Sequence, residues 1–133
     1  MLTDPLFLTE DAVLLIHREQ IAEFGGAQGV RDPGLLASAL AQPQATFEGR
    51  FLHTSLYDKA AAYLFHIAQS QAFVDGNKRT GLVTALVFLD LNGVTVDVDS
   101  EGLYELTIAV TTGKMDKTGI AAELARRFPE GQA

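Results

Sequence analysis

Residues 60–91 of the chain read AAAYLFHIAQSQAFVDGNKRTGLVTALVFLDL, two apolar segments separated by a short polar turn. The segment before Gln71 consists of good helix formers and is apolar almost all round, and the run Leu82–Leu89 is apolar again. A helix without a clear polar face is usually central and buried. The pattern predicts two buried helices, over about 55–71 and up to Leu91, at the centre of an all-α protein.

The turn between them, Asp75-Gly76-Asn77-Lys78-Arg79, holds a carboxylate, a glycine, an amide and two cations. A turn that leads into a helix presents free backbone N–H groups and the positive end of the helix dipole to an anion. Gly76 can adopt a positive φ that lets these groups converge, while Lys78 and Arg79 add donors suited to phosphate. Asp75 could hold a divalent cation against that phosphate. The turn therefore indicates a site for a nucleoside triphosphate.

Each residue of the turn also has a plain structural explanation. Asn77 can cap the following helix with its side chain, Asp75 can be a surface acid beside Lys78, and Thr80 fits the helix surface. The clustering of these residues between two buried helices, where polar groups must find partners, favours the site. The chain has no Walker A loop, no G-x-G-x-x-G and no kinase signature set, so this phosphate chemistry belongs to a different fold.

The remaining segments complete a compact helical bundle. Thr9 is placed to cap a first helix, which Gly25-Gly26 ends after apolar positions at helical spacing. We expect about six helices and no convincing sheet in a single domain over 1–133. Besides the first helix and the two central ones, the predicted helices cover about 34–42, 100–112 and 117–128.

The longest irregular stretch, residues 43–53, shows no clean period and is a candidate functional loop. Phe47 and Phe51 are expected to anchor it to the core. A sharper interpretation makes Phe47, Arg50 and Phe51 part of a loop beside the groove in which a target docks. The sequence alone leaves both interpretations open.

Bulk composition limits the class of function. Of the 133 residues, 47% are hydrophobic and 20% charged, as in a globular domain. The net charge of −7 argues against broad nucleic-acid binding, which needs many cations. Disulfides are excluded because there is no cysteine, the apolar runs are too short to span a membrane, and Met1–Leu6 lacks the pattern of an export signal. We expect a cytoplasmic protein without a membrane or direct nucleic-acid partner.

The three histidines do not stand together at metal-ligand spacing. His66, in an apolar helix, is interpreted as packed and hydrogen-bonded. His17 and His53 are interpreted as structural or exposed.

The stretch Ala72–Thr80 resembles the core motif of the Fic/Doc superfamily, and its Asn-Lys-Arg form resembles the Doc branch, the toxins of toxin–antitoxin pairs. Three other segments agree with the family, namely Gly29–Leu36, Leu56–Ala61 and Ala85–Gly93. The resemblance covers roughly residues 5 to 128 and implies the all-α Fic/Doc fold.

The resemblance also implies roles. Asp75 would bind Mg²⁺, Gly76 and Asn77 would form the anion-binding turn, and Arg79 would hold a phosphate of ATP. Lys78 stands where the AMP-transferring Fic branch usually has glycine; in the Doc branch it accompanies a reversed nucleotide pose, so that the γ-phosphate is transferred. The implied target is a threonine of elongation factor Tu, whose phosphorylation stops translation. The implied partner is a Phd-like antitoxin whose C-terminal segment folds into a groove on the toxin. AMP transfer and a non-catalytic binding module are the alternatives.

Gln71 departs from the family pattern, which has histidine here as general base for the target hydroxyl. Glutamine has no titratable group near pH 7, and loss of a general base costs about 10²–10⁴ in rate. Because the phosphate and Mg²⁺ groups are intact, we expect binding to survive and turnover to collapse. His66 lies on another helix face and cannot replace the base. A natural pseudo-enzyme or a deliberate replacement would explain Gln71, and a single change in an intact motif favours the second.

Overall fold

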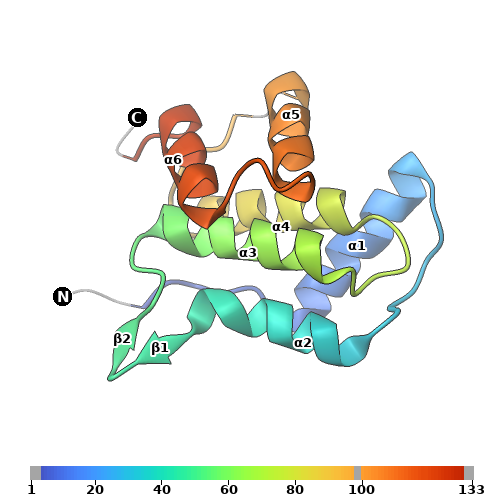
Figure 1. The fold of residues 1–133 in the computed structure, drawn as a ribbon, viewed down its shortest axis with the longest axis horizontal. Coiled ribbons are helices and arrows are strands. Elements are labelled where there is room, and N and C mark those ends of the chain that lie inside the picture. The colour runs from blue at the N-terminus through green and yellow to red at the C-terminus, as the bar shows by residue number, and fades with distance from the viewer. Residues whose placement is uncertain (1–3, 98–99, 131–133) are drawn as a thin grey trace.

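The computed structural model describes residues 4–97 and 100–130, so Met1–Thr3, used above in the argument about an export signal, lie outside it. Within these ranges the predicted all-α fold is confirmed, and the stated helix bounds agree with the observed ones to within one residue (Figure 1). The exception is the second central helix, which begins at Asn77, inside the predicted turn. The helices are α1 (Glu10–Phe24), α2 (Pro33–Ala41), α3 (Leu56–Ser70), α4 (Asn77–Leu91), α5 (Ser100–Thr111) and α6 (Lys117–Arg127), and a 3₁₀ turn, η1 (Gln42–Gln44), follows α2.

A small β-hairpin stands in the stretch for which no sheet was expected. Strands β1 (Thr46–Phe47) and β2 (Arg50–Phe51) pair antiparallel. The two residues between them, Glu48 and Gly49, both have positive φ, 52° and 78°, which suits a tight hairpin turn. The expectation of no sheet was therefore wrong here, because a two-residue turn of this kind pairs even very short strands.

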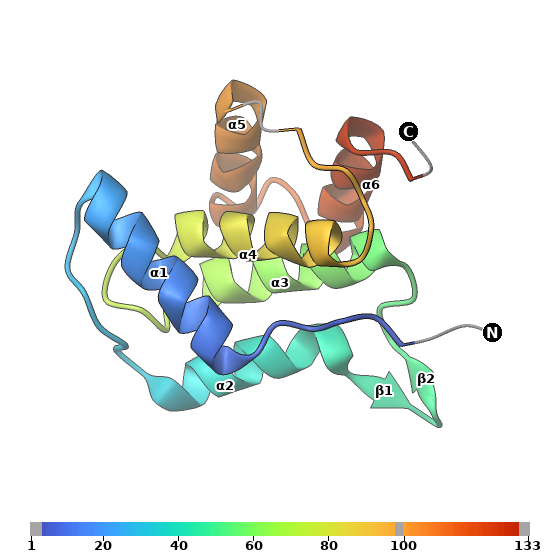
Figure 2. The same ribbon diagram turned by 180° about the vertical axis from the view of Figure 1, so that it is seen from behind.

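Helices α3 and α4 lie side by side at the centre of the molecule in both views (Figures 1 and 2). The two helices approach closely at Gly81, since a Cβ there would lie 3.0 Å from the backbone oxygen of Leu64. Thr80, next to it, is fully buried, so its predicted place on the helix surface was wrong. The prediction of two buried central helices is confirmed.

The other helices attach to this pair through buried side chains and specific hydrogen bonds. Helix α1 buries Val13, His17 and Ile21 and crosses α4 (Figure 2). The Tyr63 hydroxyl of α3 accepts from the backbone N–H of Leu8 at 3.1 Å and so holds the segment before α1. None of the helices in the described part of the chain has the length and apolar character needed to cross a bilayer.

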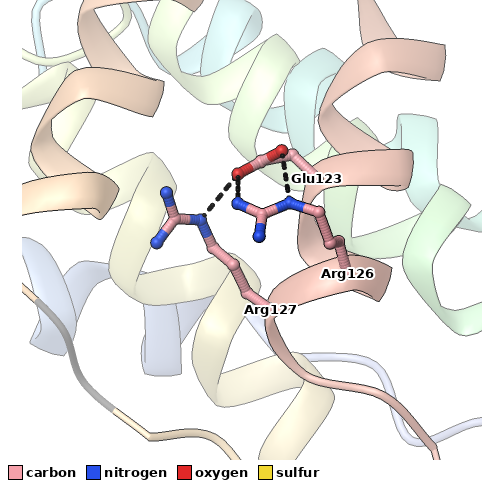
Figure 3. Close-up of polar contacts among 3 residues, drawn as sticks. All are labelled: Glu123, Arg126 and Arg127. Atoms are coloured by element: carbon pink, nitrogen blue, oxygen red, sulfur yellow. Dashed lines mark hydrogen bonds and ion pairs between the residues drawn. The ribbon is translucent and has the colours of Figure 1, made fainter.

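The end of α6 carries an ion-pair network (Figure 3). The Glu123 carboxylate accepts from Arg126 Nε at 3.2 Å and from Arg127 Nε at 2.9 Å. The hydrogen bond from Arg126 lowers the pKa of Glu123 below its usual value. A Cβ at Gly102 would collide with the Arg127 guanidinium, so this side of the network packs against α5.

A lysine held between two histidines fixes the start of α6. Lys117 Nζ lies 3.3 Å from Nε2 of His53 and 3.0 Å from Nε2 of His66. An ammonium group only donates, so both imidazoles accept its protons in their neutral form. This contact confirms that His66 is packed and hydrogen-bonded.

The folded protein should lose stability as the pH falls, because of this cluster. Burial, and then Lys117, lower the pKa of His66 from 6.5 to about 4. The unfolded chain therefore binds this proton more tightly than the folded protein does. The stability that the neutral His66 contributes to the fold is fully present above pH 6.5 and is lost as the pH falls towards 4. We expect a loss of about 1–2 kcal/mol in the free energy of unfolding, reduced for solvent screening.

Urea unfolding at about pH 7.5 and about pH 4.5 measures this loss, with His66→Gln as the matched control. The glutamine can still accept a hydrogen bond from Lys117 but does not titrate. The carboxylates affect the pH dependence of unfolding equally in both proteins, so the difference between the two proteins reports on His66 alone. Identical pH dependence in both proteins would contradict the assignment.

Candidate functional site

The polar turn joins α3 to α4 in a left-handed backbone conformation at both ends. Gln71 caps the end of α3 with φ 55° and ψ 35°. Gly76 is the N-cap of α4 with φ 78°, so the positive φ expected for it is observed. A Cβ at Gly76 would lie only 2.9 Å from Cδ1 of Ile21, because α1 packs directly against the turn. The positive φ therefore favours glycine at this position, and any side chain there would also have to displace Ile21.

Asn77 locks the turn from inside. Its Oδ1 accepts from the backbone N–H of Phe73 at 2.9 Å, and its Nδ2 donates to the Phe73 carbonyl at 3.0 Å. The side chain is buried and makes no cap hydrogen bond, so the expectation that Asn77 caps α4 was wrong. Because the side chain faces Phe73, the backbone N–H groups at the start of α4 are left for a ligand.

The loop between α1 and α2, residues 25–32, forms backbone hydrogen bonds with the start of the turn. The backbone N–H of Val74 donates to the Gly29 carbonyl at 3.1 Å, and the N–H groups of Arg31 and Asp32 both donate to the Ala72 carbonyl. These hydrogen bonds join two segments about forty residues apart and fix the path of the turn.

His17 contacts the turn directly, a role that the sequence analysis missed. Its Nε2 lies 2.8 Å from the carbonyl oxygen of Asp75, and its ring stacks on Phe73 with centroids 3.9 Å apart. The side chain is buried, in line with its spacing from Val13 and Ile21 on the inner face of α1. That spacing was the available signal, because it places His17 on the face that meets the turn.

The charged residues of the turn remain exposed. Asp75 Oδ2 accepts from the backbone N–H of Ala27 at 2.6 Å. The Arg79 guanidinium lies over the ring of Phe24, 3.9 Å from its centroid. Lys78 forms no hydrogen bond or ion pair with any residue that the structure describes, and neither Lys78 nor Arg79 pairs with Asp75 there. The two cations are thus available to an anion.

The start of α4 adds backbone donors to these cations. The first hydrogen bond of the helix runs from the N–H of Thr80 to the Gly76 carbonyl at 3.0 Å. The N–H groups of residues 77–79 precede it and have no partner in the described ranges. Together with the helix dipole and the cations of Lys78 and Arg79, they favour a phosphate group.

These groups open into one cavity of about 900 Å³. Its polar end is formed by Gln71 and by the stretch from Asp75 to Arg79. Its other end lies between α4 and α5 and is mainly apolar, with Asp90 and Thr107 as its polar residues; its apolar lining is Leu82, Val83, Leu86, Val87, Leu103 and Ile108. The volume suits a nucleoside triphosphate, since pockets for ligands of that size are roughly 300–1,000 Å³.

Asp75 fits a Mg²⁺ site of the kind that phosphate substrates complete. No cluster of three or more metal-binding side chains occurs among the described residues. Mg²⁺ usually takes only one or two carboxylates and fills its other positions with phosphate oxygens and water. One Asp75 oxygen accepts from Ala27, which orients the carboxylate and leaves the second oxygen for a cation.

Gln71 lines the cavity but offers no proton acceptor. Its Nε2 donates to the Ala68 carbonyl at 3.0 Å, and the backbone carbonyl of Gln71 accepts from Arg31 Nε at 2.7 Å. His66 bonds Lys117 and lines a separate hollow between α2 and α3, so it does not reach this cavity. The remaining nearby imidazole, His17, bonds a backbone carbonyl. No histidine of the described chain therefore stands in for a base at position 71.

The predicted docking loop is not brought to this cavity. The hairpin lies near the start of α3, whereas the polar turn follows its end (Figure 1). None of the cavity-lining residues belongs to 43–53. Phe47 is 67% exposed, so its predicted anchoring in the core was wrong. Phe51 packs against Phe7 and under Lys59 Nζ, while Arg50 is exposed.

Comparison with known proteins agrees with this geometry. Residues 7–89 match the model of the Fic/DOC family. The Toxin Doc of Mycolicibacterium smegmatis is 48% identical over 104 residues, covering 77% of this chain and 80% of that protein. The Protein kinase doc of Escherichia phage P1 is 34% identical over 121 residues, covering 91% of this chain and 94% of that protein. The chain belongs to the Fic/DOC family, and its helical bundle is the fold of that family.

Proposed function

We propose that this chain is the toxin of a toxin–antitoxin pair, built to transfer the γ-phosphate of ATP to a threonine of elongation factor Tu. The relatives named Toxin Doc and Protein kinase doc support a toxin and a phosphotransferase. The single observation that carries the proposal is the polar end of the cavity, where Lys78, Arg79 and free backbone N–H groups stand beside Asp75. Blocking translation through this target places the protein in the cytoplasm.

The residues of the turn would have different roles in phosphoryl transfer. Lys78, Arg79 and the N–H groups of residues 77–79 would bind and orient the phosphates and balance their charge. Mg²⁺ held by Asp75 would supply further charge neutralisation at the phosphate oxygens. Gly76 and Asn77 fix the backbone path of the turn that presents these groups. Phosphoryl transfer depends mainly on such positioning, so most of the machinery is intact.

Gln71 cannot perform the remaining step, which is removal of a proton from the target hydroxyl. The hydroxyl of the target threonine must lose a proton as it attacks phosphorus, and an amide does not accept one near pH 7. In this form the protein binds nucleotide and target but turns over slowly. This residue is also the observation that favours the second candidate function, a non-catalytic binding module that acts with an antitoxin.

The apolar end of the cavity suits the antitoxin partner. Side chains from α4 and α5 form an apolar surface that continues from the phosphate-binding residues. A Phd-like antitoxin whose C-terminal segment folds on binding could bury an apolar face there. Isothermal titration with a peptide of that segment would test this contact.

A paired labelling experiment tests the function. The chain and its Gln71→His variant are each incubated with elongation factor Tu, Mg²⁺ and ATP labelled at the α- or the γ-phosphate. Transfer of γ-label only, and strongly only with Gln71→His, supports the kinase toxin. Transfer of the α-label only, with the γ-label released in pyrophosphate, would indicate AMP transfer, which the presence of Lys78 opposes. No transfer by either protein, with nucleotide binding intact, would favour the binding module.

Replacing Arg79 by alanine should weaken the binding of ATP with Mg²⁺. The loss is that of a hydrogen bond between charged groups, about 1.5–3 kcal/mol, or roughly 10- to 150-fold in affinity. Calorimetric titration measures it. The matched control is Arg126→Ala on α6, which removes the same charge from an exposed arginine of the Glu123 network (Figure 3). Equal affinities for both variants would show that Arg79 does not bind phosphate.

A further inference from the structure

The last residue of α1 and the segment after it contact both charged ends of the site. Phe24 lines the cavity, is 55% exposed, and carries the Arg79 guanidinium on its ring at 3.9 Å. Three residues later, the N–H of Ala27 donates to Asp75 Oδ2 at 2.6 Å. Between them Gly26 packs against Asp75, since a Cβ there would lie 3.1 Å from the Asp75 Cβ. One short segment therefore holds a cation and an anion of the site.

Asp75 and Arg79 carry opposite charges four residues apart, one just before the N-cap of α4 and the other in its first turn, and opposite charges this close along the chain attract one another. A direct ion pair would occupy the carboxylate and the guanidinium donors together. Within the described residues this pair does not form, because Asp75 bonds Ala27 and Arg79 lies on Phe24. The segment keeps the two groups apart.

Phe24 does this without using the donors of Arg79. A cation–π contact engages the flat face of a guanidinium, whereas its five N–H donors lie in the plane. The in-plane edge therefore stays available for two hydrogen bonds to a phosphate. A carboxylate partner in the same place would occupy that edge.

We propose that Phe24 is a positioning residue, whose ring holds the Arg79 guanidinium at the cavity wall, apart from Asp75, with its donors open to a nucleotide phosphate. This inference rests on the proposed function, because it assigns Arg79 to phosphate. An exposed cation–π contact is worth about two- to fivefold in an equilibrium constant, and this is the effect expected on nucleotide affinity.

A double-mutant cycle tests the role in the full chain. Phe24→Leu keeps apolar bulk and loses the aromatic face, and calorimetric titration with ATP and Mg²⁺ should show affinity weakened about two- to fivefold. Phe24→Tyr should restore it. In an Arg79→Ala background, Phe24→Leu should cause no further loss, because the residue acts through Arg79. Leu15→Ala, at an exposed apolar residue of the same helix, is the control that should bind as the unmodified chain does.

A second readout follows Arg79 itself. In the nucleotide-free protein, the NMR resonance of Arg79 Nε–H should show the ring-current shift of the Phe24 face, lose it in Phe24→Leu and keep it in Phe24→Tyr. An unmoved resonance in Phe24→Leu, or an equal loss of affinity with and without Arg79, would overturn the positioning role alone. A chain that binds no ATP with Mg²⁺ would overturn the proposed function, and this inference with it.

Discussion

Replacing Gln71 by histidine should raise the rate of γ-phosphate transfer to elongation factor Tu by about 10²–10⁴-fold, the usual contribution of a general base. The backbone is ready for this change. Residue 71 has φ 55° and ψ 35°, a left-handed conformation that histidine adopts more readily than most side chains. Among the described residues the glutamine side chain forms a single hydrogen bond, to the Ala68 carbonyl, so little is lost when it is replaced.

The affinity for ATP with Mg²⁺ should change by less than about twofold, because the phosphate-binding groups are untouched. Initial rates of label transfer, set against calorimetric affinities, separate the two effects. The gain should also depend on pH, since only a neutral imidazole accepts the proton, and the rate should fall as the pH drops below about 6.5.

Gln71→Asn is the matched control for this rate. Asparagine also tolerates the left-handed backbone but does not titrate, so it should leave transfer at the level of the unmodified chain. A gain with asparagine equal to that with histidine would show that backbone conformation, and not a missing base, limits turnover. Transfer by the unmodified chain as fast as that of Gln71→His would show that another group already accepts the proton.

The central helices and the polar turn could be predicted because their signals are local. The apolar character of α3 and α4 is continuous in the sequence, and a helix that is apolar on all faces is usually buried in the core. The residues from Asp75 to Arg79 are neighbours along the chain, so their clustering is visible before any folding. Helix ends follow from short-range capping, as with Ser55 and Asp58 at the start of α3.

The surroundings of the turn could not be predicted, because they come from distant segments. Ala27 meets Asp75 across 48 residues and His17 meets it across 58. Nothing in the composition near Phe24 indicates that its ring supports a guanidinium. Thr80 was misplaced for a similar reason, since its burial depends on how closely α3 approaches α4 at Gly81. Long-range packing thus decides which polar residues of the motif are structural.

Asn77→Ala should lower the free energy of unfolding by about 2–4 kcal/mol, because it leaves two buried backbone groups without partners. The N–H and the carbonyl of Phe73 both bond the Asn77 amide, at 2.9 and 3.0 Å, and no other partner for them occurs among the described residues. Phe73 is itself buried beneath His17, so water does not readily replace the lost bonds. Urea unfolding at about pH 7.5 measures the loss.

Asn92→Ala provides the comparison, because Asn92 makes the same kind of contact at a helix end with solvent nearby. Its amide bonds the backbone of Leu6 at 2.8 and 2.9 Å and the Phe88 carbonyl at 2.8 Å. Water can reach the Leu6 groups once the side chain is removed, so this variant should lose only about 1 kcal/mol. A loss in Asn77→Ala no larger than that in Asn92→Ala would mean that the Phe73 groups find other partners. Asn77→Ala should instead show the larger loss in the free energy of unfolding, and the protein that remains folded should bind ATP with Mg²⁺ more weakly. Both results together would show that the Asn77 amide holds the turn and also keeps the backbone N–H donors of the turn in place for the phosphate.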